Sequence, residues 1–337
     1  MKYVTDPMHH LPSPGGSVVR TLNMLRKALL RRQKPSNLTD DGHEDKPLCT
    51  TNTQQVTANG IDSGAYTEVF EPLMGFEGVD VYLHGSRADA TENSFSDFDD
   101  LIVIDREIIT AADYPICKLV HRLNAVDMEF CCIDPLQHHG HWIIDRGKLQ
   151  CYDESYMPLV VLKSGIAING QATLEYAVDI DRTRSGLVRN IRATVANIEQ
   201  LYSEYRAGTI NCNNLKRLVG SFALLPAFMF QSRGERVDKP QAISMSRDIF
   251  SENAAECVRW ATRVRDGWHH VTDSRDFRRF SRYPRLFSNP FLYRRFALRF
   301  APTLPDAYSQ AEHERLESRS VEAFVAESLA EVEREKT

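Results

Sequence analysis

The sequence predicts an α+β protein in which a mixed sheet flanked by helices is followed by a helical bundle. Within residues 79–105 an apolar segment runs into Gly85-Ser86, and after a polar loop residues 96–99 open a second apolar segment, as is typical of neighbouring strands. From residue 179 onward the apolar residues recur at helical spacing, first over 179–205 and then over 213–230. A chain of 337 residues with 42% hydrophobic residues is long enough for two domains with full cores.

The composition is typical of a cytoplasmic enzyme. The net charge of -5 is close to neutral for this length, so no overall field directs the chain to nucleic acid. The seven cysteines are odd in number and lack Cys-x-x-Cys spacing, which indicates reduced thiols. No stretch of the sequence approaches the ~20 consecutive apolar residues of a transmembrane helix.

Residues 1–60 are expected to form a separate amino-terminal segment. Residues 17–32 place leucines and valine at helical spacing among basic residues, and we expect this helix to dock on the protein or a partner rather than on a membrane. Residues 34–60 have almost no apolar periodicity and many turn-forming residues, which predicts a flexible linker. A helix within 63–74 is expected before the first strand.

The segment with the clearest chemistry covers residues 79–105. Residues i and i+2 of a strand project to one face, so Asp97 and Asp99 should lie together while the residue between them turns into the core. Two carboxylates this close repel each other unless a divalent cation, typically Mg²⁺, relieves the repulsion. Across the loop, Gly85 allows close backbone approach, and the amides and hydroxyl around Ser86 are donors for phosphate oxygens.

This segment resembles the signature of the polymerase-β-type nucleotidyltransferases, in which a Gly-Ser turn precedes a Ser-Asp-x-Asp strand. The chain matches it at Gly85-Ser86 and at residues 96–99, with a loop length common in small bacterial members. Many of those proteins have a second glycine at the sixth loop position, where this chain has Ala90. The resemblance implies a nucleotidyltransferase domain over 61–171, and the alternative is a hairpin with a merely solvated acidic turn.

Such enzymes carry a third carboxylate on a later strand beside the first two. Residues 124–135 contain alternating apolar and polar side chains and are predicted to form that strand, with Asp127 and Glu129 on one face. The resemblance favours Glu129, because the family pattern usually runs from an acidic residue through four apolar ones to a helix start, which residues 130–133 and then Asp134-Pro135 supply here. Asp127 remains the alternative ligand.

The resemblance also implies a mechanism. Asp97 and Asp99 would hold two Mg²⁺ ions on the triphosphate of an NTP, expected to be ATP, while the Gly-Ser turn grips the outer phosphates. Glu129 would help to bind the second ion and accept the proton of an acceptor hydroxyl. Arg87 is either a further cation for the phosphates or an ordinary surface arginine.

Three histidines and a tryptophan follow closely, at His138, His139, His141 and Trp142. Neighbouring histidines on one short piece rarely surround an ion, so a zinc site would need ligands from another segment as well. Packing is the expected role of Trp142, with stacking on a base or acceptor ring as the alternative. Residues 157–170 should form an apolar helix or strand, a glycine turn and a short extended segment.

Residues 172–337 are predicted to form a helical domain that builds the acceptor pocket against the catalytic domain. Apolar stripes at 179–205 and 213–230 predict two helices, and 254–268 supplies another amphipathic one. The turn around Lys239 resembles one in the carboxy-terminal bundle of aminoglycoside adenylyltransferases and related toxin nucleotidyltransferases.

The strongest local charge asymmetry lies in residues 275–300, where arginines alternate with Phe and Tyr and there is one acidic residue. This composition suits RNA, and also anionic lipid or an acidic partner. The alternative is that the aromatics are core and the arginines pair with the glutamate-rich terminal helix expected over 306–335.

Three functions are consistent with these residues. The first is transfer of AMP from ATP onto a hydroxyl of a small molecule such as an aminoglycoside. The second is toxin-like transfer onto RNA, such as tRNA, or onto a protein, which residues 275–300 favour. The third is a non-catalytic interaction protein that kept the fold, against which the intact Asp97 and Asp99 argue.

Overall fold

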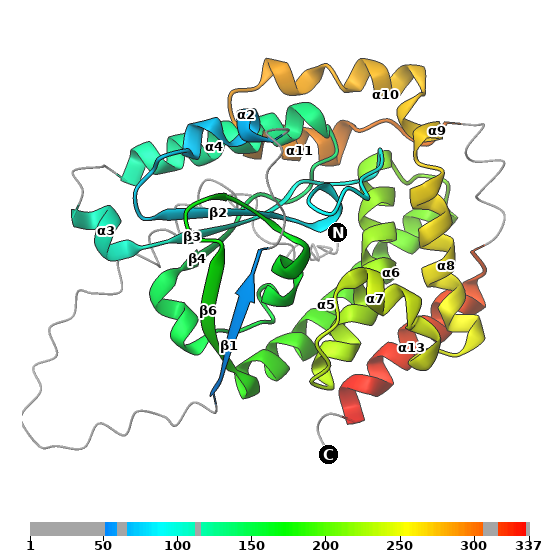
Figure 1. The fold of residues 1–337 in the computed structure, drawn as a ribbon. Coiled ribbons are helices and arrows are strands. Elements are labelled where there is room, and N and C mark those ends of the chain that lie inside the picture. The colour runs from blue at the N-terminus through cyan, green and yellow to red at the C-terminus, as the bar shows by residue number, and fades with distance from the viewer. Residues whose placement is uncertain (1–50, 59–65, 112–115, 306–315, 335–337) are drawn as a thin grey trace, which may run out of the picture.

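The computed structural model describes residues 51–58, 66–111, 116–305 and 316–334. It shows a small mixed sheet with flanking helices and a helical carboxy-terminal region (Figure 1), which confirms the predicted α+β class at this level. The basic helix predicted over 17–32 lies outside the described residues. Within them, no helix is long and apolar enough to cross a membrane.

The main sheet has four strands in the order β4-β3-β2-β5. The predicted strand pair is present, with β2 (Val79–His84) antiparallel to β3 (Asp99–Ile104). β5 (Ile166–Asn169) pairs with the other edge of β2, and β4 (Trp142–Asp145) runs parallel to β3. Because Trp142 lies opposite Leu101, the chain just before β4 runs alongside the start of β3.

Both faces of this sheet are covered, which explains why its two central strands are buried along almost their whole length. On one face Val81 and Ile102 belong to a buried cluster with Phe130 of α4 (Ile116–Ile133). On the other face Tyr82 and Leu101 pack into a cluster that includes residues of the smaller sheet and of the segment 149–162.

The prediction of a third strand over residues 124–135 is wrong, because this segment is the end of α4 and the turn after it. Its local alternation is part of a longer stripe that begins before the segment, and Asp134-Pro135 forms a turn instead of starting a helix. The buried residues of α4 recur at helical spacing: Leu119, Leu123, Val126 and Phe130.

A second sheet has two antiparallel strands, β1 (Thr51–Thr57) and β6 (Thr173–Asp179), with Val56 opposite Leu174. The prediction of a flexible linker over 34–60 is therefore wrong for residues 51–57. This strand obtains its hydrogen bonds from a partner far along the chain, so local composition does not reveal it.

Short elements complete the sheet half. The helix predicted within 63–74 is described from Thr67 onward, as α2 (Thr67–Phe70) and η1 (Glu71–Leu73). The prediction for 157–170 is confirmed by η4 (Leu159–Ser164), a turn at Gly165 and then β5. The others are η2 (Gly85–Arg87), α3 (Arg106–Ala111) and η3 (Arg146–Cys151).

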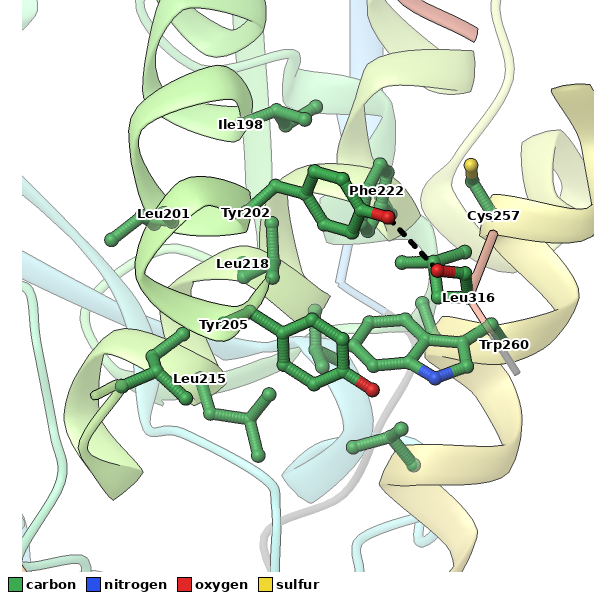
Figure 2. Close-up of a cluster of buried hydrophobic side chains, with 14 of the residues drawn as sticks. Ile198, Leu201, Tyr202, Tyr205, Leu215, Leu218, Phe222, Cys257, Trp260 and Leu316 are labelled. Atoms are coloured by element: carbon green, nitrogen blue, oxygen red, sulfur yellow. Dashed lines mark hydrogen bonds between the residues drawn. The ribbon is translucent and has the colours of Figure 1, made fainter. Parts of the chain in front are cut away.

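The helices predicted from apolar stripes are present. They are α5 (Ile180–Arg206), α6 (Cys212–Ser232) and α8 (Glu252–Asp266), and they pack with α13 (Ser318–Arg334). Figure 2 shows their core, in which Tyr205 of α5 meets Trp260 of α8 with ring centres 5.3 Å apart. The buried hydroxyl of Tyr202 donates to the carbonyl oxygen of Leu316 at 2.9 Å, which fixes the chain just before α13.

The arginine-aromatic segment packs on the sheet half of the molecule. It forms α10 (Arg275–Phe280), η6 (Tyr283–Leu286) and α11 (Pro290–Phe300), and α11 and η6 lie against α4 (Figure 1). Tyr293 is buried there and donates its hydroxyl to the Pro135 carbonyl oxygen at 2.8 Å. The short helix α9 (His269–Thr272) connects it to α8, and two further short helices, α7 (Lys239–Ser244) and η5 (Ser246–Asp248), lie between α6 and α8.

The loop between β2 and β3 has a left-handed residue at Ala90, with φ of 57°. This conformation strains a residue with a Cβ by about 1–2 kcal/mol, whereas glycine adopts it freely. We predict that Ala90→Gly leaves the free energy of unfolding unchanged or raises it by up to about 1 kcal/mol in urea denaturation, because relief of strain offsets the entropy of glycine.

The matched control is Ala88→Gly in the same loop, where φ is -82° and no strain is relieved. This change should lower the free energy of unfolding by about 0.5–1 kcal/mol. Equal losses at the two positions would contradict the assignment of strain to Ala90.

Candidate functional site at the start of strand β3

The turn after β2 is built against the carboxylate of Asp99. Gly85 has a φ of +73°, in the left-handed region, and the preceding His84 pairs with Asp99 across the sheet. A Cβ at Gly85 would lie 2.8 Å from Oδ2 of Asp99, closer than real Cβ contacts. Only glycine therefore allows the turn, with Ser86 next in it, to approach the carboxylate this closely.

Asp97 and Asp99 flank a residue that is anchored in the core. Phe98 is buried and stacks on Phe130 of α4 with ring centres 4.6 Å apart, as expected for the residue between two outward carboxylates. The Asp97 side chain is 13% exposed and that of Asp99 is 33% exposed. Both carboxylates are thus accessible, while the backbone that carries them is held firmly.

Histidines from the segment before β4 contact both carboxylates. Nδ1 of His138 lies 3.4 Å from Oδ2 of Asp97, and Nε2 of His139 lies 3.0 Å from Oδ1 of Asp99. The parallel register of β4 on β3 brings the two segments together. Ligand atoms of Asp97, His138 and His139 all lie within 4.8 Å of one another, so the second segment that a metal site requires is present.

The two histidines differ in charge at neutral pH. Burial lowers the pKa of His138, although Asp97 opposes this shift. For His139, the hydrogen bond and charge of Asp99 outweigh burial and raise the pKa to about 9. Burial raises the pKa of Asp99, but contact with His139 lowers it by more. At pH 7, His138 is therefore neutral, and His139 and Asp99 form a charged pair.

A buried lysine of α6 contacts the site from the helical half. Lys216 is 1% exposed, and its Nζ lies 2.9 Å from Oδ1 of Asp97 and 2.6 Å from Oδ2 of Asp134. Against the effect of burial, Lys216 and His138 hold the pKa of Asp97 well below its usual range. For Asp134, burial outweighs the lysine and raises the pKa to about 6. The ammonium group thus ties α6 to the start of β3 and to the end of α4.

Two further cations belong to this region. Lys239, at the start of α7, is half-buried, and burial together with the charge of Arg265 on α8 lowers its pKa. The charges of Asp99 and Asp97 act on Lys239 in the opposite direction. The carboxylates therefore have cations from α6 and α7 within electrostatic reach.

The two candidates for a third carboxylate point to different sides of α4. Asp127 is buried and accepts two hydrogen bonds from Arg294 of α11, one of them at 2.7 Å. Glu129, about 200° further around the helix, is exposed. Among the described residues, the ligand atoms that converge on one point come from Asp97 and the histidines, and Glu129 is not with them. The choice of Glu129 assumed that residues 124–135 form a strand, but Glu129 lies on the helix α4.

Two other predicted residues have structural contacts. Arg87 donates from Nη2 to the Ser96 carbonyl oxygen at 3.0 Å, and its guanidinium lies 4.1 Å from the ring centre of Phe98, so it braces the loop. Trp142 is half-buried and packs on Tyr156 with ring centres 5.0 Å apart. Packing is therefore the contact that the structure shows for Trp142.

The third histidine forms a buried pair of its own. Nδ1 of His141 lies 2.6 Å from Oδ2 of Asp100, and its Nε2 lies 2.8 Å from the Leu123 carbonyl oxygen. Burial opposes protonation, but Asp100 raises the pKa of His141 to about 9. This charged pair fixes the segment before β4 against α4, and so positions His138 and His139.

The donor set at the start of β3 combines carboxylates with imidazoles. Oδ1 of Asp97 is buried and lies 2.9 Å from the ammonium group of Lys216, which balances its charge. Carboxylate oxygens suit Mg²⁺, whereas imidazoles suit zinc and other transition metals. The ligand atoms that converge belong to one carboxylate, Asp97, and two imidazoles, His138 and His139, and form a candidate site for a metal ion with Asp99 paired to His139 beside it.

Sequence reasoning missed Lys216 and Asp134. The available signal was a lysine between apolar residues of α6, next to Leu215 and close to Leu218, on a helix that is buried over most of its surface. Its partners lie on two distant segments, which no local pattern connects. No protein-family model, curated protein or solved structure matches the chain.

Lys216→Met should destabilise the protein strongly, because it leaves Asp97 and Asp134 without their cation. Breaking a buried ion pair by removing one partner costs about 3–5 kcal/mol. Without the ammonium the pKa of both carboxyls rises, and that of Asp134 lies still further above its ordinary value. A carboxyl with a raised folded-state pKa loses stability as the pH rises, so the deficit should be larger at pH 8 than at pH 4.

Urea denaturation at the two pH values measures both effects. Lys148→Met is the matched control, since Lys148 is an exposed lysine on η3. A deficit as small as that of Lys148→Met, or one that is independent of pH, would contradict the role of Lys216.

Proposed function

We propose that the protein is a metal-dependent nucleotidyltransferase that moves a nucleoside monophosphate, AMP from ATP, onto a hydroxyl acceptor and releases pyrophosphate. One observation carries the proposal: the Gly85 turn closes against Asp99, with Asp97 next to it. A backbone turn of this kind is suited to phosphate, and paired carboxylates are suited to a divalent cation. Because the turn and the carboxylates are in contact, one triphosphate with its bound ion would reach both.

Asp97 and Asp99 are the residues that would hold the ion, expected to be Mg²⁺. When bound, it would neutralise charge on the triphosphate and on the leaving pyrophosphate. Lys216 keeps the Asp97 carboxyl ionised, and His139 keeps Asp99 ionised and oriented. Glu129, which the sequence predicted as the third carboxylate, is not placed to help bind a second ion.

The phosphates have donors and positive charge on two sides. The hydroxyl and amide of Ser86 are in the turn that faces Asp99. Lys239 and Arg265 supply cations from the helical half, and the charge of Asp99 acts on Lys239. The triphosphate would therefore lie between the turn after β2 and the start of α7.

The transfer forms a bond from the acceptor oxygen to the α-phosphorus and breaks the bond from that phosphorus to the bridging oxygen of pyrophosphate. The proton of the acceptor hydroxyl requires a base. His138 suits this role, because its pKa is lowered, which keeps it neutral at pH 7, and its side chain, beside Asp97, is 35% exposed. His139 is already protonated at pH 7, so it does not.

Asp97→Asn and Asp99→Asn should each abolish transfer, because each removes a charged oxygen ligand while preserving side-chain shape. Radiolabelled ATP with Mg²⁺ and total tRNA, aminoglycosides or no acceptor gives the readout, with pyrophosphate release measured in parallel. Glu129→Gln is the matched control and should retain activity. Full turnover in both aspartate variants would remove the basis of the proposal, and a comparable loss in Glu129→Gln would restore Glu129 as a ligand.

His138→Gln should lower kcat by about 100-fold or more, the usual contribution of a general base, while the affinity for Mg²⁺ stays unchanged. Turnover and calorimetric titration with Mg²⁺ measure the two quantities separately. His139→Gln is the comparison, and it should weaken Mg²⁺ binding because Asp99 loses the partner that orients it. If His138→Gln weakens Mg²⁺ binding as much as turnover, His138 is a metal ligand instead of the base.

A further inference from the structure

A cavity of about 660 Å³ lies beside the candidate site, between the loop after β2, the end of α4 and the segment from α9 to η6. We call it the arginine cavity. Its size is typical of small-ligand sites. Besides Ser96, six of the residues that line it carry a guanidinium or a hydroxyl group: Arg87, Ser94, Thr272, Ser281, Arg282 and Arg285.

The arginine cavity adjoins the carboxylates through two of its other lining residues. Ser96 immediately precedes Asp97, and Asp134 shares the ammonium group of Lys216 with Asp97. The Lys216 charge also compensates Asp134, which is the one acidic residue that lines the cavity. The wall of the cavity is therefore positive on balance, and it is continuous with the loop that carries Asp97.

Two arginines of this wall have no acidic partner among the residues that the structure describes. The prediction that the terminal helix pairs with the arginines of 275–300 is wrong for the described residues, because α13 packs on α8 and α5. Its Glu331 binds Arg233, and its Glu327 accepts hydrogen bonds from Ser251. Arg294 pairs with Asp127, whereas Arg282 and Arg285 are exposed and have no acidic partner within the described ranges.

A free guanidinium group favours an anion that accepts two hydrogen bonds in its plane, and phosphate does so. Serine and threonine hydroxyls add neutral donors around such a group. A cationic acceptor such as an aminoglycoside would be repelled by the same wall. The arginine cavity therefore suits an anionic acceptor and not the aminoglycoside that was expected from the sequence.

We propose that the arginine cavity binds a phosphate group of the acceptor, so that the acceptor is a phosphate-bearing hydroxyl compound. The reaction of this acceptor rests on the proposed function, but its binding does not. Two kinds of acceptor carry such a phosphate group, a phosphorylated small molecule and the backbone of RNA. Arg278 and Arg279 distinguish them, because they are exposed on α10 outside the cavity lining and would contact only a longer polyanion.

The test is a binding titration of the full chain in EDTA without NTP. The probes are ribose 5-phosphate, total tRNA and neomycin. The cavity variant is Arg282→Gln/Arg285→Gln, and the matched control is Arg278→Gln/Arg279→Gln, with the same loss of charge on the same segment. All four side chains are exposed, so thermal unfolding of both variants should match the wild type.

We expect the cavity variant to bind ribose 5-phosphate or tRNA about tenfold or more weakly, as for the loss of charge-assisted hydrogen bonds. Loss of ribose 5-phosphate binding in the cavity variant alone assigns a small phosphorylated acceptor. Loss of tRNA binding in both variants assigns RNA. Equal binding of the phosphate probes by wild type and cavity variant overturns the proposal, as does failure of the wild type to bind either probe, or displacement of ribose 5-phosphate by neomycin.

Asp99→Asn separates this result from the fate of the proposed function. It should bind the phosphate probes as the wild type does while transfer is lost. If the wild type shows no transfer to any acceptor, the proposed function fails and the binding result stands. If Asp99→Asn loses transfer and the cavity variant binds normally, the proposed function stands and the assignment of the cavity fails.

Discussion

The buried ammonium group of Lys216 is the constraint on which the site depends. An isolated charge in a protein interior is so costly that it persists only with close, hydrogen-bonded partners. Lys216 finds them in Asp97 and Asp134, which belong to the start of β3 and the end of α4. The helical half must therefore dock where these two segments meet, and docking in any other register would leave three charges unpaired. One ion pair fixes both the ionisation of Asp97 and the position of α6 beside it.

The parallel pairing of β4 with β3 decides what surrounds the carboxylates. This pairing brings the chain before β4 alongside Asp97 and Asp99, and that chain carries His138 and His139. The histidines matter for the chemistry, because an imidazole can be neutral or charged near pH 7 while a carboxylate there is usually charged. One histidine is neutral and the other forms a charged pair, since their carboxylate contacts differ in length and strength.

The features that were predicted correctly from the sequence are those that a local pattern of residues encodes. The strand pair, the turn at Gly85, the carboxylates at Asp97 and Asp99 and the helices of the bundle follow from alternation, helical stripes and glycine chemistry. The segment 124–135 was misassigned because a short window of alternation also fits the end of a helix whose stripe begins earlier. β1 and the Lys216 pair depend on partners far along the chain, so their stabilising contacts exist only in the folded structure.

Acidic and basic side chains lie in different parts of the fold. A chain with a net charge of -5 can therefore have a positive wall at the arginine cavity. The described acids of α13 make their contacts within the bundle, whereas the arginines of α10 and η6 remain on the surface above α4. Beneath them, Phe280 stacks parallel to Phe296 with ring centres 5.9 Å apart, and Tyr293 is buried. This aromatic layer fixes the backbone that carries the arginines. A positive surface on a rigid support binds an anion at a lower cost in chain ordering than the same charges on a flexible tail would.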